Sequence, residues 1–136
     1  MNEHKENCIF CKIINKEIPT NFTYEDDKFV AFLDINPKAD GHTLLIPKEH
    51  YAWMQETPDE IVGEIFITTK KLMQNLISEK KCEYVKVKVI GKDVPHFHIH
   101  LIPRYNKDNL HTPPTKEYKG VEAKKVLIKI VKAIKK

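Results

Sequence analysis

The 136-residue chain lacks any apolar run close to the ~20 residues that a membrane-spanning helix requires. Its first residues, M-N-E-H-K-E-N, are polar and lack the apolar stretch of a secretory signal. Internal repeats, low-complexity tracts and linkers are also missing. These absences argue against a membrane protein and predict a single domain over residues 1–136, for which a cytoplasmic location is the default expectation.

Cysteine is scarce as well, with only Cys8, Cys11 and Cys82. An odd count without a signal peptide argues against a disulfide framework. Cys8 and Cys11 form a C-x-x-C motif, which taken alone fits a redox pair, half of a zinc site or two small buried residues. A redox pair of the thioredoxin type needs a βαβ context that this N-terminus lacks, and a zinc site needs two further ligands.

The charge is unevenly distributed over the chain. The formal net charge is +4, and hydrophobic residues make up 41% of the sequence, which suits one domain with a packed core. Residues 115–136 contain eight lysines and two glutamates, hence +6, so the other residues sum to −2. This basicity indicates a solvated helix face more than an anionic partner, and no specific nucleic-acid partner is expected.

Residue patterns predict an α+β fold with an antiparallel five-stranded sheet, two main helices and a C-terminal amphipathic helix. Thr57 and Glu60 form a T-x-x-E capping box for the longest helix. The predicted helices span 8–16, 58–79 and 120–134, and the strands span 22–25, 28–34, 42–47, 84–90 and 96–103. We expect a core over about 8–104 and an extension over about 105–136. The apolar stripe expected to pack the longest helix on the sheet is Ile61, Val62, Ile65, Phe66, Leu72, Met73, Leu76 and Ile77.

Residues 96–102 read H-F-H-I-H-L-I. Because side chains alternate in a strand, His96, His98 and His100 would share one face while the apolar residues point into a core. The pattern argues against a purely structural role, because a plain strand offers no partners for so many ring nitrogens. The row could ligate a metal, although a third histidine in line reaches the same tetrahedral ion poorly. Alternatively the row is catalytic, with a central nucleophile flanked by groups that handle charge and protons.

This motif matches the His-φ-His-φ-His-φ-φ signature (φ being hydrophobic), and the chain resembles the histidine triad nucleotide-binding proteins. The resemblance extends through C-I-F-C-K-I-I-N-K-E-I-P at 8–19, Y-E-D-D-K-F-V-A-F-L-D-I-N-P at 24–37 and G-H-T-L-L-I-P-K-E-H at 41–50. It implies a nucleotidyl hydrolase or transferase acting on purine nucleoside monophosphates that carry a leaving group on the α-phosphate. It also implies a two-fold dimer that buries the helix at about 58–79 and the strand at 84–90.

The resemblance implies residue roles too. His98 would be the nucleophile that forms a covalent nucleotidyl-histidine, assisted at the phosphate by His100 and His42. Asp34 would accept hydrogen bonds from the ribose hydroxyls. The residues expected to wall the base are Ile9, Phe10, Ile13, Phe32 and Ile35. In many bacterial members two cysteines and two histidines bind zinc, and the corresponding set here is Cys8, Cys11, His50 and His96.

One segment departs from the family pattern. Familiar members carry an asparagine-bearing loop and a G-Q-[ST]-V run that contacts the phosphate, where this chain has I-G-K-D-V-P. Gly91 keeps its place, Lys92 stands at the glutamine, and Asp93 stands at the hydroxyl residue. A carboxylate beside a phosphate is unfavourable unless neighbouring cations compensate.

Three functions therefore remain open. The first is an enzyme that hydrolyses a phosphoramidate, phosphoanhydride or acyl-phosphate linkage of a purine nucleotide. The second is a nucleotide-binding or interaction module whose altered loop has reduced turnover. The third is a zinc hydrolase that uses the three histidines as ligands. DNA-end repair is not expected, because no DNA-binding zinc finger follows the histidines.

Overall fold

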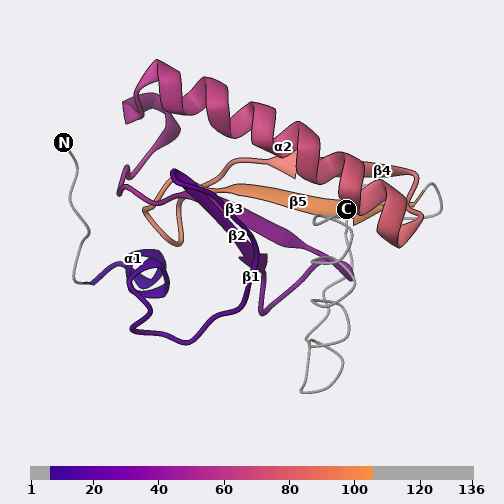
Figure 1. Cartoon of the computed structure of the whole chain (residues 1–136), viewed down its shortest axis with the longest axis horizontal. Helices are drawn as coiled ribbons and strands as arrows, with labels where there is room; N and C mark the ends of the chain where they lie inside the picture. Colours follow the sequence, from indigo (N-terminus) through magenta and orange to yellow (C-terminus); the bar gives the residue numbers. More distant parts are fainter. Residues whose placement is uncertain (1–6, 106–136) are drawn as a thin grey trace.

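The computed structural model describes residues 7–105, so the predicted helix over 120–134 and the basic segment lie outside the described residues. Within this range the chain forms two α-helices, one short 3₁₀ helix (η1) and five strands (Figure 1). None of these helices is long and apolar enough to cross a membrane. The elements are α1 (Ile9–Ile14), β1 (Phe22–Glu25), β2 (Phe29–Leu33), β3 (Thr43–Pro47), η1 (Met54–Glu56), α2 (Asp59–Lys80), β4 (Tyr84–Lys88) and β5 (Ile99–Arg104).

The five strands form one sheet in the order β1-β2-β3-β5-β4, and every neighbouring pair is antiparallel. The long helix α2 lies across one face of this sheet, and the short helix α1 lies on the other side (Figure 1). The predicted α+β fold, with a five-stranded antiparallel sheet and two main helices, is confirmed.

Strand alternation divides the core into two layers. Phe97, Ile99 and Leu101 join the cluster under α2, as expected from H-F-H-I-H-L-I. The opposite cluster joins α1 to the sheet and contains Cys8, Phe10, Cys11, Ile13, Val30, Phe32, Leu44 and Ile46. The histidines therefore lie on the α1 side of the sheet.

Helix α2 differs in detail from its prediction. The predicted capping box is wrong, because Pro58 is the N-cap and no side chain caps the helix. Thr57 ends the preceding η1 helix, and its hydroxyl donates to the Trp53 carbonyl at 2.9 Å. The buried face of α2 also includes Thr68 and Thr69, together with Ile65, Leu72 and Leu76. Phe66 and Ile77, which were expected to pack on the sheet, are exposed.

The last strand begins later than predicted. β5 starts at Ile99, so His96 and His98 precede it and only His100 lies within it. The backbone N–H of His96 donates to the Val94 carbonyl, and that of Phe97 donates to the Tyr51 carbonyl, so this segment is held by loop contacts. The histidines still share a side of the molecule, because the rings of His96 and His98 both contact Phe10.

Candidate functional site

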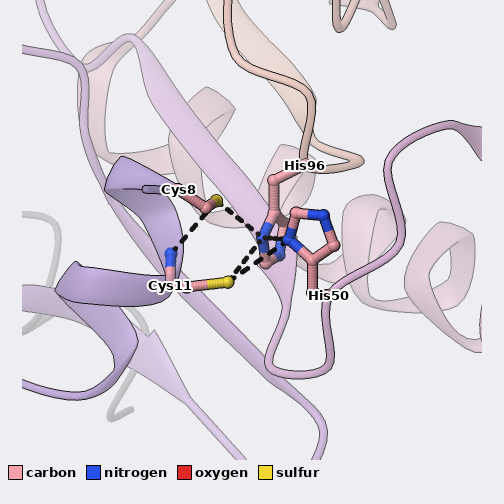
Figure 2. Close-up of side chains that lie close together, drawn as sticks. All are labelled: Cys8, Cys11, His50 and His96. Carbon is pink, nitrogen blue, oxygen red and sulfur yellow. Dashed lines mark hydrogen bonds between the residues drawn. The ribbon is translucent and has the colours of Figure 1, made fainter. Parts of the chain in front are cut away.

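Two clusters of polar side chains lie on the α1 side of the sheet. The first contains the four predicted metal ligands, Cys8, Cys11, His50 and His96, all of which are buried. Their ligand atoms lie within 4.8 Å of one another, and Figure 2 shows the four side chains converging. Cys8 caps α1 and Cys11 lies in its first turn, whereas His50 follows β3 and His96 precedes β5.

The distances in this cluster match a tetrahedral ligand set. Cys11 Sγ lies 3.3 Å from His50 Nδ1, both sulfurs lie 3.5 Å from His96 Nδ1, and the two Nδ1 atoms are 3.2 Å apart. Zinc–sulfur and zinc–nitrogen bonds of about 2.3 and 2.05 Å at tetrahedral angles would separate sulfur from nitrogen by about 3.6 Å, and nitrogen from nitrogen by about 3.3 Å. The four residues therefore fit a zinc ion.

The second ring nitrogen of His96 supports the same interpretation. His96 Nε2 lies 2.9 Å from the Pro47 carbonyl oxygen. A carbonyl can only accept, so Nε2 carries the proton, and Nδ1 keeps its lone pair toward the sulfurs. A metal-bound histidine usually donates its other N–H to such a backbone carbonyl, which fixes the ring and its tautomer.

The second cluster contains the predicted catalytic residues. His98 Nδ1 donates to the His96 carbonyl at 2.7 Å, so the neutral ring carries its lone pair on Nε2. The ring is buried edge-on against Phe10, with centroids 5.0 Å apart. Burial lowers the pKa of His98, while the hydrogen bond to His96 and the charges of Asp34 and Asp93 oppose that shift. His98 is therefore a neutral imidazole with one fixed tautomer, as a nitrogen nucleophile requires.

His42 and His100 form a hydrogen-bonded pair beside His98. The Lys38 N–H donates to His42 Nδ1 at 2.9 Å, and His42 Nε2 lies 2.9 Å from His100 Nδ1. Burial and then the neighbouring His100 lower the pKa of His42 to about 3. Burial and then His98 lower the pKa of His100 to about 4. Both rings are thus neutral, so His42 Nε2–H donates to His100, and the proton of His100 lies on Nε2.

Asp34 lies at the edge of this cluster, just after β2. One of its oxygens accepts from the Asn36 N–H at 2.9 Å, and the other lies 3.6 Å from His42 Nε2. Burial raises the pKa of Asp34, and the Asn36 N–H and the charges of Lys38, His98 and Lys88 oppose that shift. A partly buried carboxylate is available here to accept hydrogen bonds.

Asp34, His42 and His100 also come close enough together to be considered as metal ligands. The hydrogen bonds argue against a metal ion at this place. A metal at His42 Nε2 would move the proton of that ring to Nδ1, which already accepts from the Lys38 N–H. The three-histidine zinc hydrolase also loses support, because neither potential ligand group within residues 7–105 contains His98.

The predicted nucleoside-binding residues fall into two groups. Phe10, Ile13 and Phe32 are buried in the cluster beneath α1. Ile9 and Ile35 are 46% and 77% exposed, so their side chains are accessible to a ligand. The apolar wall expected for a base is therefore divided between core residues and surface residues.

The loop before the histidines contains Gly91 and Asp93. Gly91 has φ +79°, and a Cβ at this position would lie 3.4 Å from the Trp53 ring, so glycine suits both the backbone and the packing. Asp93 is close enough to His98 to raise its pKa electrostatically. The carboxylate of Asp93 thus acts on the candidate nucleophile, although Asp93 and Lys92 are both exposed.

Two lysines that sequence reasoning did not select also adjoin the site. Lys88, at the end of β4, is paired in register with His100, and the backbone of Lys38 binds His42. The alternation Y-V-K-V-K places Lys88 on the polar face of its strand, but its neighbour across the sheet depends on strand register. The positive charges of Lys88 and Lys38 both lower the pKa values of His42 and His100.

Comparison with known proteins gives consistent matches. The HIT domain family model matches residues 15–107. An uncharacterized HIT-like protein of Methanocaldococcus jannaschii is 42% identical over 127 residues, covering 90% of this chain and 98% of the relative. An adenosine 5′-monophosphoramidase of Saccharomyces cerevisiae is 40% identical over 71% of this chain and 62% of its own length. An adenylylsulfatase of Arabidopsis thaliana is 35% identical over 78% of this chain and 56% of its own length.

Solved structures match most of the chain. A hypothetical histidine triad nucleotide-binding protein from Sulfolobus tokodaii superposes with a TM-score of 0.84 at 31% identity, covering 94% of this chain and 92% of its own. A zinc-bound histidine triad family protein from Mycobacterium smegmatis gives a TM-score of 0.83 at 26% identity, with 95% and 94% coverage.

Proposed function

The chain belongs to the histidine triad (HIT) family, and on that premise we propose that it is a nucleotidyl hydrolase or transferase. Its substrates would be purine nucleoside monophosphates joined through the α-phosphate to a leaving group by a phosphoramidate, phosphoanhydride or acyl-phosphate linkage. Relatives named as an adenosine monophosphoramidase and an adenylylsulfatase support this class of reaction. The observation that carries the proposal is the tautomer of His98, whose Nδ1–H is held by the His96 carbonyl.

In the first step His98 Nε2 attacks the α-phosphorus. A nitrogen–phosphorus bond forms, and the bond from phosphorus to the leaving group breaks with its electron pair. The imidazolium formed on His98 keeps its Nδ1–H on the His96 carbonyl, which stabilises the developing positive charge. An amine leaving group takes up a proton from solvent as it departs, and His100 Nε2–H donates a hydrogen bond to its nitrogen, because a neutral imidazole does not give up its only N–H proton.

In the second step water attacks the same phosphorus. The nitrogen–phosphorus bond breaks, His98 returns to its neutral form, and the proton released by water passes to solvent. Splitting one displacement into two easier ones is the advantage of covalent catalysis. His42 keeps His100 in the required tautomer throughout, because its own Nδ1 is occupied by the Lys38 N–H.

Nucleotide binding would use the residues that surround the histidines. Asp34 would accept hydrogen bonds from the ribose hydroxyls. Ile9 and Ile35 would contact the base from the surface, supported by the buried Phe10, Ile13 and Phe32. The positive φ of Gly91 would hold the loop close to the phosphate.

Zinc would be held by Cys8, Cys11, His50 and His96. The ligand distances and the His96–Pro47 hydrogen bond support this assignment, as does the zinc-bound relative. When bound, the ion would supply no bond-making chemistry and would link α1 to the segment that follows β3 and the segment that precedes β5. His98 and His100 remain outside this ligand set.

A homodimer is the expected assembly. β4 is an edge strand of the sheet, so one side of its backbone is open to a second copy. The exposed Phe66, Ile67 and Ile77 of α2 also supply apolar surface. A monomer at micromolar concentration in light scattering would contradict this assembly.

A second candidate function is a nucleotide-binding module with little turnover. Asp93 favours it, because a carboxylate near His98 opposes the approach of an anionic phosphate. One measurement distinguishes the two functions, because only the enzyme forms a covalent adduct at His98.

The test is incubation of the purified protein with adenosine 5′-phosphoramidate, followed by acid quench and intact mass spectrometry. The wild type should show a nucleotidyl adduct and release AMP, and His98→Ala should do neither. Equal turnover by the two proteins would remove His98 as the nucleophile. Nucleotide binding without an adduct in the wild type would favour the binding module.

A further inference from the structure

Lys88 occupies a position beside the candidate active site that no family role described above assigns. In β4, Val85 is buried and Val87 packs against the core cluster beneath α2. Side chains alternate along a strand, so Lys86 and Lys88 lie on the opposite face, which is the face of the histidines. The register pairs Lys88 with His100, and His100 with Leu44, in one row across β4, β5 and β3.

The charge environment shows that the ammonium of Lys88 is close to the catalytic groups. Its positive charge lowers the pKa values of His42 and His100 and opposes the rise at Asp34. Burial, and then the charges of Lys86 and Lys38, lower the pKa of Lys88 itself. Within residues 7–105 Lys88 has no hydrogen-bonded or ion-paired side-chain partner, although Asp34 attracts it at longer range.

A partly buried cation with two other lysines around it is electrostatically unfavourable, because like charges raise its free energy. An anion placed between Lys88 and Lys38 would relieve this repulsion and form charge-assisted hydrogen bonds. The α-phosphate alone would face His98 and His100. Lys88 lies beyond His100 toward the β4 edge, where the group attached to that phosphate could extend.

We propose that Lys88 selects nucleotides whose leaving group is itself an oxyanion, such as phosphate or sulfate, over those that release a neutral amine. This inference rests on the proposed function and specifies its substrate class. When an oxyanion departs, the bond from phosphorus to the bridging oxygen breaks and the electron pair stays on that oxygen. Lys88 stabilises that charge electrostatically, and no proton transfer is needed. An amine takes up a proton as it departs, leaves as a neutral molecule and gains nothing from a nearby cation.

The experiment compares kcat/KM for adenosine 5′-phosphosulfate and adenosine 5′-phosphoramidate. Removing the charge in Lys88→Met should lower the value for the sulfate about 10- to 100-fold and change that for the amidate by less than about threefold. Lys88→Arg, which keeps the positive charge, should retain most of the wild-type kcat/KM for adenosine 5′-phosphosulfate. Lys86→Met is the matched control, because Lys86 lies on the same face of β4 but pairs with Ile102, away from the histidines. An equal loss on both substrates in Lys88→Met would overturn the proposal.

A binding measurement separates failure of this inference from failure of the proposed function. If the wild type shows neither turnover nor an adduct, the proposed catalytic function is refuted. Binding of an anionic group by Lys88 can still be measured in that case. Calorimetry would then compare α,β-methylene-ADP, which cannot be cleaved between its two phosphorus atoms, with adenosine. Lys88→Met should weaken binding of the methylene nucleotide about 10-fold or more and leave that of adenosine unchanged. Unchanged affinity for both would overturn the inference.

Discussion

His42 Nε2 lies 2.9 Å from His100 Nδ1, and the direction of this hydrogen bond is set by the backbone behind it. Because the Lys38 N–H occupies His42 Nδ1, His42 must donate, and His100 must hold its own proton on Nε2. A main-chain group in the loop between β2 and β3 thus determines which nitrogen of a candidate catalytic residue carries the N–H.

Replacing His42 should therefore impair catalysis through His100. We expect His42→Ala to lower kcat about 10²-fold, which is a usual loss when one positioned hydrogen-bond donor to the transition state is removed. The adduct at His98 should still form, but more slowly. The loss should be greatest with amine leaving groups, because these depend on the hydrogen bond from His100.

Two measurements distinguish this effect from unfolding. Single-turnover kinetics resolve formation of the adduct from its hydrolysis, and the thermal midpoint reports the fold. His42→Gln should recover part of the rate, since its amide can donate to His100 Nδ1. Wild-type rates in His42→Ala would show that His100 needs no support from His42.

The pH dependence follows from burial of the histidines. Folding lowers the pKa values of His98, His100 (to about 4) and His42 (to about 3) from an ordinary 6.5. The unfolded chain therefore binds more protons below pH 6.5, so the free energy of unfolding should decrease as pH falls from 6.5 toward 4. Activity should persist below pH 6.5, because the neutral nucleophile survives there.

Urea denaturation at several pH values measures how the free energy of unfolding changes with pH. The acid limb of kcat/KM measures how far activity persists below pH 6.5. His42→Gln removes one titrating group and should flatten the dependence of stability on pH between 6.5 and 4. An acid limb of kcat/KM centred at 6.5 or above would contradict a lowered pKa of His98.

The zinc assignment gives a third prediction. Protein purified without chelator should contain one zinc per chain, and Cys11→Ser should contain much less, because the ligand set loses one thiolate. Cys82→Ser is the matched control, since Cys82 is also a buried free cysteine but lies under α2, away from the cluster. Elemental analysis measures the metal, and zinc content that is equal in both variants would contradict the site.

Removal of zinc should affect stability more than chemistry. Chelation should lower the thermal midpoint by several degrees, because α1 loses its link to the sheet. The adduct at His98 should still form at low temperature, since neither His98 nor His100 belongs to the ligand set. An adduct that disappears on chelation while the protein remains folded would assign the ion a catalytic role.

Much of this organisation follows from local pattern, and the remainder depends on contacts between distant segments. The alternation in H-F-H-I-H-L-I correctly predicted that Phe97, Ile99 and Leu101 enter the core. The predicted start of this strand was wrong because the N–H groups of His96 and Phe97 bind loop carbonyls. The register that brings Lys88 beside His100, and the hydrogen bond between His42 and His100, depend on strand pairing and cannot be read from local pattern.

Thr57 illustrates the same limit at a helix terminus. The T-x-x-E pattern is a sound local signal for a capping box. Here the hydroxyl instead donates to the Trp53 carbonyl, which closes the short helix η1, and Pro58 takes the N-cap position. The Thr57 hydroxyl can either cap α2 or bind the Trp53 carbonyl at the start of η1, and in this structure it does the second.

Asp93 provides the last prediction. Its negative charge raises the pKa of His98 and would repel the α-phosphate, so Asp93→Ser should increase kcat/KM for adenosine 5′-phosphoramidate several-fold. Asp93→Asn, which removes the charge and keeps the shape, should give a similar gain. Both variants should move the acid limb of the pH profile downward, because His98 loses a charge that favours its protonated form. Lys92→Met is the control, because it changes a neighbouring side chain of the same loop and leaves the charge of Asp93 in place. Reduced activity in both Asp93 variants would mean that the carboxylate assists the reaction, by orienting His98 or by serving as an acid.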